Sequence, residues 1–241
     1  MAFNLFMVKV LLVKSLVSAE TLAKQSRKPS GWLGKNILQP MFVKGNADLN
    51  QFILEQMAVQ ANDQILEVGF GPGELLFQLC QQNPSALFTG ADFSPLMLQQ
   101  ATLRTQRFIK SGQLSLIEAS SDNMPFDRFS FNQVACANTL YFWQPPEPHF
   151  KDVLRVLKSG GKFVMGFRTG EQIDRMQLHP TIFARYTTAE VESLLELAGF
   201  ENITIQSRIG FPVDSFCAVA YKPSYKSMAE SAKINHLSVK S

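Results

Sequence analysis

Three glycines at alternate positions, Gly69, Gly71 and Gly73, follow a short apolar run and precede a helical pattern. Glycine permits a tight turn at this point and lets a ligand approach the backbone, because no Cβ stands in the way. A dinucleotide-binding turn has the spacing GxGxxG, whereas here the third glycine comes one residue early and Glu74 takes its place. A carboxylate in the first helical turn would also repel a pyrophosphate. The turn therefore predicts a ligand that is not a dinucleotide.

Two acidic residues narrow the chemistry of that ligand. Glu67 lies inside the apolar run before the glycines, and Asp92 ends the next predicted strand. A buried carboxylate is costly without a partner, and a ligand ammonium would offset that cost, while an acid at the end of the second strand can accept both hydroxyls of a ribose. Together they indicate a nucleoside with a cationic amino-acid arm. The alternatives are that backbone donors satisfy Glu67, that Asp92 only caps the helix beginning near Pro95, and that Gly73 only permits helix packing.

Alternating strand and helix signals must position these residues. Periodicity and turn residues predict strands at 64–68, 86–91, 114–118, 133–137, 162–167, 203–208 and 216–221, and helices at 75–82, 95–110, 150–157 and 188–198. This pattern predicts an α/β fold, a doubly wound, Rossmann-like, mostly parallel seven-stranded sheet with a terminal antiparallel strand. Ligands of such sheets bind beyond the carboxyl ends of the strands, so the residues that follow each strand are the candidates.

Charge and composition exclude several classes of function. The net charge of +3 conceals an asymmetry, because residues 1–50 carry seven Lys or Arg against two acids, residues 222–241 carry four against one, and the middle is net negative. A nucleic-acid footprint would have to lie on the ends, and no nucleic-acid partner is expected. The three cysteines and three histidines are dispersed, so neither a disulfide framework nor a metal site is predicted, and a cytoplasmic setting is expected.

The amino-terminal segment is apolar but does not resemble a signal peptide. Lys9 and Lys14 sit inside the apolar stretch, where a signal peptide would have its positive charge first. A helix that spans a membrane is disfavoured too. The segment is interpreted as a helix that packs on the domain or on a partner subunit, with peripheral membrane contact as the alternative.

Five motifs together resemble those of class I S-adenosylmethionine-dependent methyltransferases, of the small bacterial type with a generic methyltransferase domain. They are EVGFGPG, GADFSPLMLQQA, MPF, NTLYFW and RVLKSGGKFVMGFR, and the resemblance spans roughly residues 29–221. It implies an enzyme that transfers a methyl group from S-adenosyl-L-methionine to a small-molecule acceptor. It also implies that residues 1–45 are a helical extension that covers the substrate and that 46–222 are the cofactor-binding methyltransferase domain. The polar composition of residues 223–241 predicts a disordered tail.

The resemblance assigns cofactor contacts by position. The assigned residues are Glu67, Gly69, Gly71, Gly73, Asp92, Phe93, Ser120, Ser121 and Asn138. Glu67 would face the amino end of the methionine and Asp92 would hold the ribose. Ser120 stands where the family usually has an acidic residue near the adenine, and Asn132 stands where it usually has the Asp that opens the fourth strand. A structural role is expected for Asn132.

Asn138 and Tyr141, which follow the fourth predicted strand, are the candidate catalytic residues. Methyl transfer from a sulfonium is an in-line displacement, so alignment and exclusion of water can carry most of the catalysis. Their N-x-x-Y spacing resembles the NPPY element of amino methyltransferases, with Thr139 and Leu140 in place of both prolines. The alternative is that Tyr141 and its aromatic neighbours only pack a lid. His149 could act as a base, but a surface position is expected.

The roof over the acceptor is expected from residues 1–45 and 169–185. These segments contribute apolar and basic side chains, including Trp32, Arg175, Met176, Phe183 and Arg185. They suit a small, partly apolar, anionic or lipid-like acceptor. Two other functions remain open at this point, a catalytically silent cofactor-binding protein that acts by interaction and a nicotinamide-dependent oxidoreductase.

Overall fold

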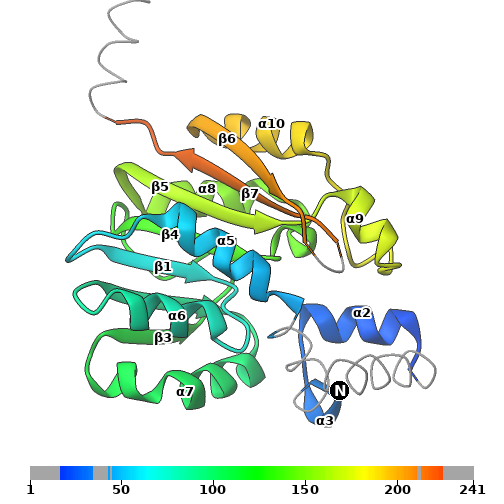
Figure 1. Cartoon of the computed structure of the whole chain (residues 1–241), viewed down its shortest axis with the longest axis horizontal. Helices are drawn as coiled ribbons and strands as arrows, with labels where there is room; N and C mark the ends of the chain where they lie inside the picture. Colours follow the sequence, from blue (N-terminus) through cyan, green and yellow to red (C-terminus); the bar gives the residue numbers. More distant parts are fainter. Residues whose placement is uncertain (1–16, 35–42, 44, 211–212, 225–241) are drawn as a thin grey trace, which may run out of the picture.

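The computed structural model describes residues 17–34, 43, 45–210 and 213–224 (Figure 1). The interpretation of residues 1–16 as a packed or membrane-contacting helix therefore lies outside the described residues, as does most of the expected tail at 223–241. Within the described ranges, no helix is both long and apolar enough to cross a membrane.

One seven-stranded sheet forms the centre of the molecule, in the order β3-β2-β1-β4-β5-β7-β6. Its strands are β1 (Gln64–Val68), β2 (Leu87–Asp92), β3 (Leu114–Glu118), β4 (Phe131–Ala137), β5 (Leu157–Phe167), β6 (Glu201–Arg208) and β7 (Ser215–Tyr221). The first five strands run parallel, and β7 pairs antiparallel with both β5 and β6. The predicted fold class is confirmed. The strand order reverses between β1 and β4, which is where a doubly wound sheet binds its ligands.

Helices cover both faces of this sheet (Figure 1). The face with α5 (Ala47–Met57), α6 (Glu74–Gln82) and α7 (Pro95–Lys110) buries one hydrophobic cluster. The opposite face, with α8 (Glu147–Val156) and α10 (Thr188–Ala198), buries the other. The remaining described elements are α2 (Ala19–Arg27), α3 (Gly31–Leu33), the 3₁₀ turn η2 (Leu140–Phe142) and α9 (Gly170–Arg175).

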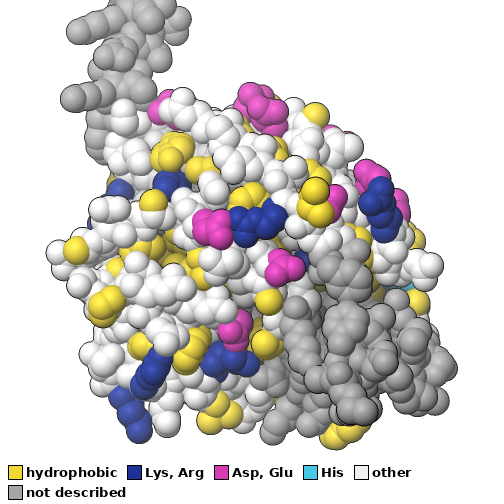
Figure 2. All heavy atoms as spheres, in the orientation of Figure 1, with side chains coloured by type: hydrophobic (Ala, Val, Ile, Leu, Met, Phe, Trp, Pro, Cys, Tyr) yellow, Lys and Arg dark blue, Asp and Glu magenta, His cyan; other side chains and the backbone are white. Residues whose placement is uncertain are grey.

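The molecular surface carries charges of both signs. On the face shown in Figure 2, Lys and Arg side chains are interspersed with Asp and Glu side chains and do not gather into a basic patch. One pair on this surface joins Arg208 of β6 to Glu55 of α5, with both side chains partly exposed. Such exposed pairs contribute little to stability, about 0–1 kcal/mol. The helices on the two faces are therefore held to the sheet mainly by the two hydrophobic clusters.

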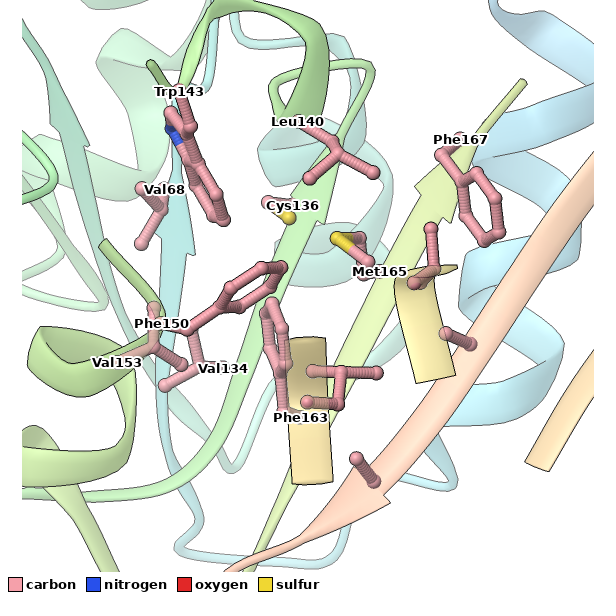
Figure 3. Close-up of a cluster of buried hydrophobic side chains, with 14 of the residues drawn as sticks. Val68, Val134, Cys136, Leu140, Trp143, Phe150, Val153, Phe163, Met165 and Phe167 are labelled. Carbon is pink, nitrogen blue, oxygen red and sulfur yellow. The ribbon is translucent and has the colours of Figure 1, made fainter. Parts of the chain in front are cut away.

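Successive side chains of β5 point to opposite faces of the sheet and so contribute to both hydrophobic clusters. Phe163, Met165 and Phe167 point into one hydrophobic cluster, whereas Val164 belongs to the other. In the first cluster Phe150 of α8 is fully buried and lies edge-on to Phe163, with ring centroids 6.3 Å apart (Figure 3). The strand is apolar on both sides because helices cover both faces, as expected for a central strand of an α/β sheet.

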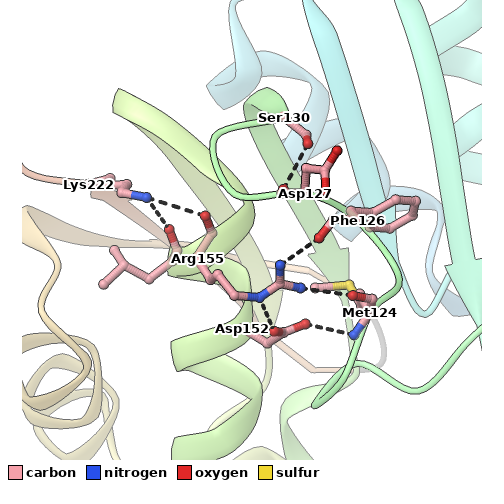
Figure 4. Close-up of polar contacts among 8 residues, drawn as sticks. Met124, Phe126, Asp127, Ser130, Asp152, Arg155 and Lys222 are labelled. Carbon is pink, nitrogen blue, oxygen red and sulfur yellow. Dashed lines mark hydrogen bonds and ion pairs between the residues drawn. The ribbon is translucent and has the colours of Figure 1, made fainter.

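The connection from β3 to β4, residues 119–130, contains no helix and depends on α8 for its shape. Arg155 donates from Nε to Asp152 Oδ1 (2.6 Å) and from Nη2 to the Met124 carbonyl (2.8 Å), and Asp152 Oδ2 accepts from Met124 N–H (2.8 Å) (Figure 4). A third bond joins Arg155 Nη1 to the Phe126 carbonyl at 2.5 Å. Asp152 is buried, so this pair anchors the loop through charge-assisted bonds in a site shielded from water.

The structure differs from the sequence-based elements in two places. The strand predicted at 162–167 begins at Leu157 in the structure, because Lys222 exchanges backbone hydrogen bonds with Gly160 and Gly161 and extends the pairing with β7. Helices α5 and α9 were not predicted. Asn132 has a structural role, since its Oδ1 accepts from Gln64 N–H (2.9 Å) and from Lys158 Nζ (2.8 Å).

Candidate active site

A cavity of about 1010 Å³ opens where β1, β2, β4 and β5 end. Its walls include one of the first residues after each strand, namely Gly69, Phe93, Asn138 and Arg168. The volume lies at the upper end of the roughly 300–1,000 Å³ of small-molecule sites, so it can hold a large ligand or two ligands side by side.

The glycine turn forms one wall through Gly69 and Gly71. Both have positive φ, +70° and +52°, and a Cβ on Gly69 would lie 2.4 Å from the side chain of Thr139. A Cβ on Gly71 would meet no atom within 4 Å and would project into open space. Gly73 does not line the cavity, and a Cβ there would lie 2.9 Å from Ala101 Cβ of α7. The absence of a side chain at Gly73 therefore allows helix packing, which was the alternative role, and its contact with the cofactor stays a prediction.

Glu67 brings a buried carboxylate to the cavity wall. Its side chain is 2% exposed, and Oε2 has no hydrogen-bond partner. Burial, reinforced by the nearby charge of Asp92, raises the pKa of Glu67 well above its usual value, although a backbone bond from Leu76 opposes the shift. Backbone donors thus satisfy the group only in part. A ligand ammonium would supply the missing partner, and the methionine arm of S-adenosyl-L-methionine carries one.

Asp92 joins the glycine turn to the end of β2. Its Oδ2 accepts from Gly71 N–H (2.8 Å) and its Oδ1 from Ser94 N–H (2.9 Å), while burial raises its pKa. The helix cap of α7 is Ser94, whose hydroxyl accepts from Met97 N–H, so capping is not the role of Asp92. A carboxylate has about four acceptor sites, and those not used here can accept ribose hydroxyls. Phe93, 36% exposed, lines the adjacent wall.

Ser120 and Ser121 do not line this cavity. The Ser120 hydroxyl donates to Asp122 Oδ1 (2.5 Å), and the Ser121 hydroxyl bonds His149 Nδ1 (2.7 Å). The His149 ring in turn stacks on Trp143 with ring centroids 5.0 Å apart. Both hydroxyls therefore have partners outside the cavity, and the adenine contacts of the two serines stay a prediction. His149 is half-buried, not fully exposed at the surface as expected.

Asn138 and Tyr141 both line the cavity but turn their polar atoms to the protein. Asn138, with φ +55°, donates from Nδ2 to Asn46 Oδ1 (2.8 Å), and its Oδ1 accepts from the Tyr141 hydroxyl (2.8 Å). The Tyr141 hydroxyl also accepts from Arg168 N–H (2.6 Å). Burial raises the pKa of Tyr141 to about 12, so the phenol stays protonated near neutral pH. The two residues brace each other and are not arranged to take an acceptor proton.

Arg168 completes this network, and sequence reasoning missed it. The side chain is 6% exposed, with Nη1 donating to Asn138 Oδ1 (2.9 Å) and Nη2 to the Gly45 carbonyl (3.0 Å). Its Nε has no hydrogen-bond partner among the residues that the structure describes. The signal was present, since Arg168 follows β5 as Asn138 follows β4, but the residue was considered only as the last position of the motif RVLKSGGKFVMGFR.

The far end of the cavity is apolar. It is lined by Phe142, Ile173, Met176, Leu178 and Phe183. The Phe142 and Phe183 rings lie with centroids 5.0 Å apart. Of the roof residues expected from sequence, Met176, Phe183 and Arg175 line the cavity. Trp32 and Arg185 do not, because Trp32 is 70% exposed and Arg185 Nε is bonded to Asp174 Oδ1 (2.8 Å).

The glycine turn, the acids beside it and their place at the point where the strand order reverses define a Rossmann-like enzyme of the class I methyltransferase type. The methyltransferase domain family matches residues 66–165. Over 179 residues, 74% of this chain and 94% of the relative, the chain is 32% identical to the "Uncharacterized methyltransferase YdaC" of Bacillus subtilis (strain 168).

Two further comparisons agree. The chain is 22% identical to the ubiquinone/menaquinone biosynthesis C-methyltransferase UbiE of Geobacter sp. (strain M21). The alignment spans 174 residues, which are 72% of this chain and 66% of that protein. The structure of Haemonchus contortus phosphoethanolamine N-methyltransferase 2 in complex with S-adenosyl-L-methionine superposes with a TM-score of 0.68 at 17% identity, over 86% of this chain and 60% of that chain. The protein belongs to the S-adenosyl-L-methionine-dependent methyltransferases, and it is an enzyme that uses this cofactor.

Replacing Gly71 with valine should weaken cofactor binding without unfolding the protein. Gly112 is a matched control, since both glycines have positive φ (+52° and +77°) and open space where a Cβ would lie. Each valine should therefore cost a similar backbone strain, about 1–2 kcal/mol. Only Gly71 lines the cavity, so calorimetry should show S-adenosylhomocysteine binding weakened by about tenfold or more in Gly71→Val and unchanged in Gly112→Val. Equal binding by both variants would place the ligand elsewhere.

Cofactor binding should release a proton from Glu67. The pKa of Glu67 is raised in the free protein, so the carboxyl stays protonated at pH values above its ordinary pKa. A ligand ammonium beside it would lower that pKa again. Affinity for S-adenosylhomocysteine should therefore rise as the pH increases from the ordinary pKa of a glutamate to the raised pKa of Glu67, and it should weaken on acidification. Calorimetry in buffers of different ionisation enthalpy counts the protons released, and Glu67→Gln should remove both the release and the pH dependence. If the unsubstituted protein releases no proton on binding, the pairing of Glu67 with the ligand ammonium is contradicted.

Proposed function

We propose that the protein transfers the methyl group of S-adenosyl-L-methionine to a small-molecule acceptor with an apolar body. The observation that carries the proposal is the chemical division of the cavity. Acids and glycines line the end at β1 and β2, whereas aromatic and aliphatic side chains line the end formed by η2 and residues 173–183. A relative that acts in ubiquinone/menaquinone biosynthesis supports an apolar acceptor.

The residues of this chain perform the reaction mainly by alignment. Bound in the cavity, S-adenosyl-L-methionine supplies an electrophilic methyl group. Glu67 and Asp92 would fix its ammonium and its ribose, and Gly71 would leave room for it beside the backbone. Phe142 and Phe183 would exclude water from the acceptor end. In-line displacement from a sulfonium needs little more, because proximity and exclusion of water can contribute most of the rate.

Asn138 and Tyr141 act as positioning residues in this proposal. Their side-chain oxygens accept from Arg168, so they hold the end of β4 and the end of β5 in one arrangement at the boundary between the two halves of the cavity. Asn138 keeps its positive φ because three partners surround its side chain. A shift here would move the acceptor relative to the methyl group, and a displacement of about 1 Å costs about a hundredfold in rate.

The amino-terminal segment serves as a cover in this proposal. Ser26, Arg27 and Pro29 line the cavity, and the Ser94 hydroxyl donates to the Pro29 carbonyl (3.4 Å). Residues 17–34 thus lie beside the cavity end where Asp92 and Phe93 are found. This supports a division into a cover at 1–45 and a cofactor-binding domain at 46–222, followed by the tail at 223–241.

The direct test is to identify the methylated compound. Purified protein, methyl-labelled S-adenosyl-L-methionine and a fractionated cell extract should yield label in an organic-extractable small molecule, which mass spectrometry then identifies. Gly112→Val should transfer label and Gly71→Val should not. Label that appears only in water-soluble compounds without an apolar body, or in protein or nucleic acid, would contradict the proposed acceptor class.

Removing the Tyr141 hydroxyl should slow transfer without weakening cofactor binding. Tyr141→Phe leaves Arg168 N–H and Asn138 Oδ1 each without one partner, so their positions should relax. With the acceptor found above and saturating cofactor, turnover should fall by about tenfold, while affinity for S-adenosylhomocysteine stays within about twofold. Tyr186→Phe, a half-buried tyrosine that does not line the cavity, is the matched control. Parent turnover in Tyr141→Phe would show that only the ring matters.

A further inference from the structure

We infer that the acceptor carries a carboxylate that docks against Arg168. This inference rests on the proposed function, because it names a chemical group on the acceptor of that same site. The starting observation is a buried cation on the cavity wall. Arg168 is 6% exposed, and its two hydrogen-bonded side-chain nitrogens reach only neutral oxygens, on Asn138 and Gly45.

Within the described part of the chain, the charge of Arg168 has no counterion. Among the described residues, no Asp or Glu lies within ion-pair distance of its guanidinium. Residues 1–16, 35–42, 44 and 211–212, which the structure does not describe, contain no acidic residue. Ser224, the last described residue, lies beside Gly160 near the start of β5, whereas Arg168 follows the other end of that strand. Because a buried unpaired charge is costly, an anion that enters with a ligand would be strongly favoured.

The other charged side chains of the cavity do not share this property. Arg175 pairs with Glu171 and both are largely exposed, and Glu74 pairs with Arg104. Arg27 is exposed, so water solvates its charge. Within the described part of the cavity wall, Arg168 is thus the buried cation that lacks an anion.

The position of Arg168 assigns this anion to the acceptor half of the cavity. The proposed cofactor contacts lie at β1 and β2, whereas Arg168 ends β5, which is separated from β1 by β4. Because β4 lies between them, β5 and β1 are two strand spacings apart, about 10 Å. Arg168 shares its part of the wall with the apolar residues Ile173 and Phe183, which belong to the segment that follows it. A carboxylate joined to an apolar body fits both features.

Decanoate, decanol and decyltrimethylammonium are suitable probes because they share one apolar chain and differ in charge. Each is titrated by calorimetry into the full chain saturated with S-adenosylhomocysteine. Decanoate should bind at least about tenfold more tightly than decyltrimethylammonium, a comparison that needs no variant. Arg168→Gln should weaken decanoate binding by about tenfold or more and leave decanol binding unchanged, which also shows that the cavity is intact. Arg168→Lys should retain decanoate binding, as should Arg128→Gln, an exposed arginine outside the cavity.

Two results would overturn the inference. Equal binding of decanoate and decyltrimethylammonium would show that Arg168 does not select an anion. If Arg168→Gln instead weakens S-adenosylhomocysteine but not 5′-methylthioadenosine, which lacks the amino-acid arm, the anion is the carboxylate of the cofactor. Failure of the proposed function looks different, since the labelled extract would then yield no methylated small molecule whatever the charge preference of the probes.

Discussion

The hydrogen bond from Gly71 N–H to the Asp92 carboxylate holds the site together. At 2.8 Å it ties the turn after β1 to the end of β2, and the other oxygen of Asp92 binds Ser94, which begins α7. A carboxylate this buried is costly to ionise, and the two backbone donors offset part of that cost. Asp92 therefore stabilises the positive-φ turn and keeps its remaining acceptor sites towards the cavity. The same group determines the local fold and is placed to bind the ligand.

One end of the cavity carries carboxyl groups and the other end carries a guanidinium, and each end has a polar atom without a partner among the described residues. Glu67 has an oxygen without a partner at the β1 end, and Arg168 has a nitrogen without one at the β5 end. Burial keeps water from compensating either group, so ligands that bring an ammonium to one end and an anion to the other would be oriented before any reaction occurs. The Asn138 and Tyr141 side chains lie in the network that fixes the cationic end.

Sequence reasoning predicted what depends on local pattern and parallel pairing. Strand ends follow from periodicity, and parallel pairing brings Gly69, Asp92 and Asn138 to one edge of the sheet. It failed where a position depends on distant partners. Ser120 and Ser121 belong to a loop that is anchored by Arg155, over thirty positions later in the chain, and their hydroxyls bond Asp122 and His149. The packing of Gly73 on α7 and the stacking of His149 on Trp143 were likewise outside any local signal.

The acceptor end is harder to predict than the cofactor end for a physical reason. The proposed cofactor end is built from residues at or just after the ends of two neighbouring strands, so register alone places them. The proposed acceptor end is assembled from η2, α9, Phe183 and the network that reaches Asn46 before α5, segments brought together only by tertiary packing. Small changes in any of these segments can alter the acceptor while the sheet and its glycine turn stay the same. This explains how relatives with the same fold come to carry names as different as a C-methyltransferase of quinone biosynthesis and a phosphoethanolamine N-methyltransferase.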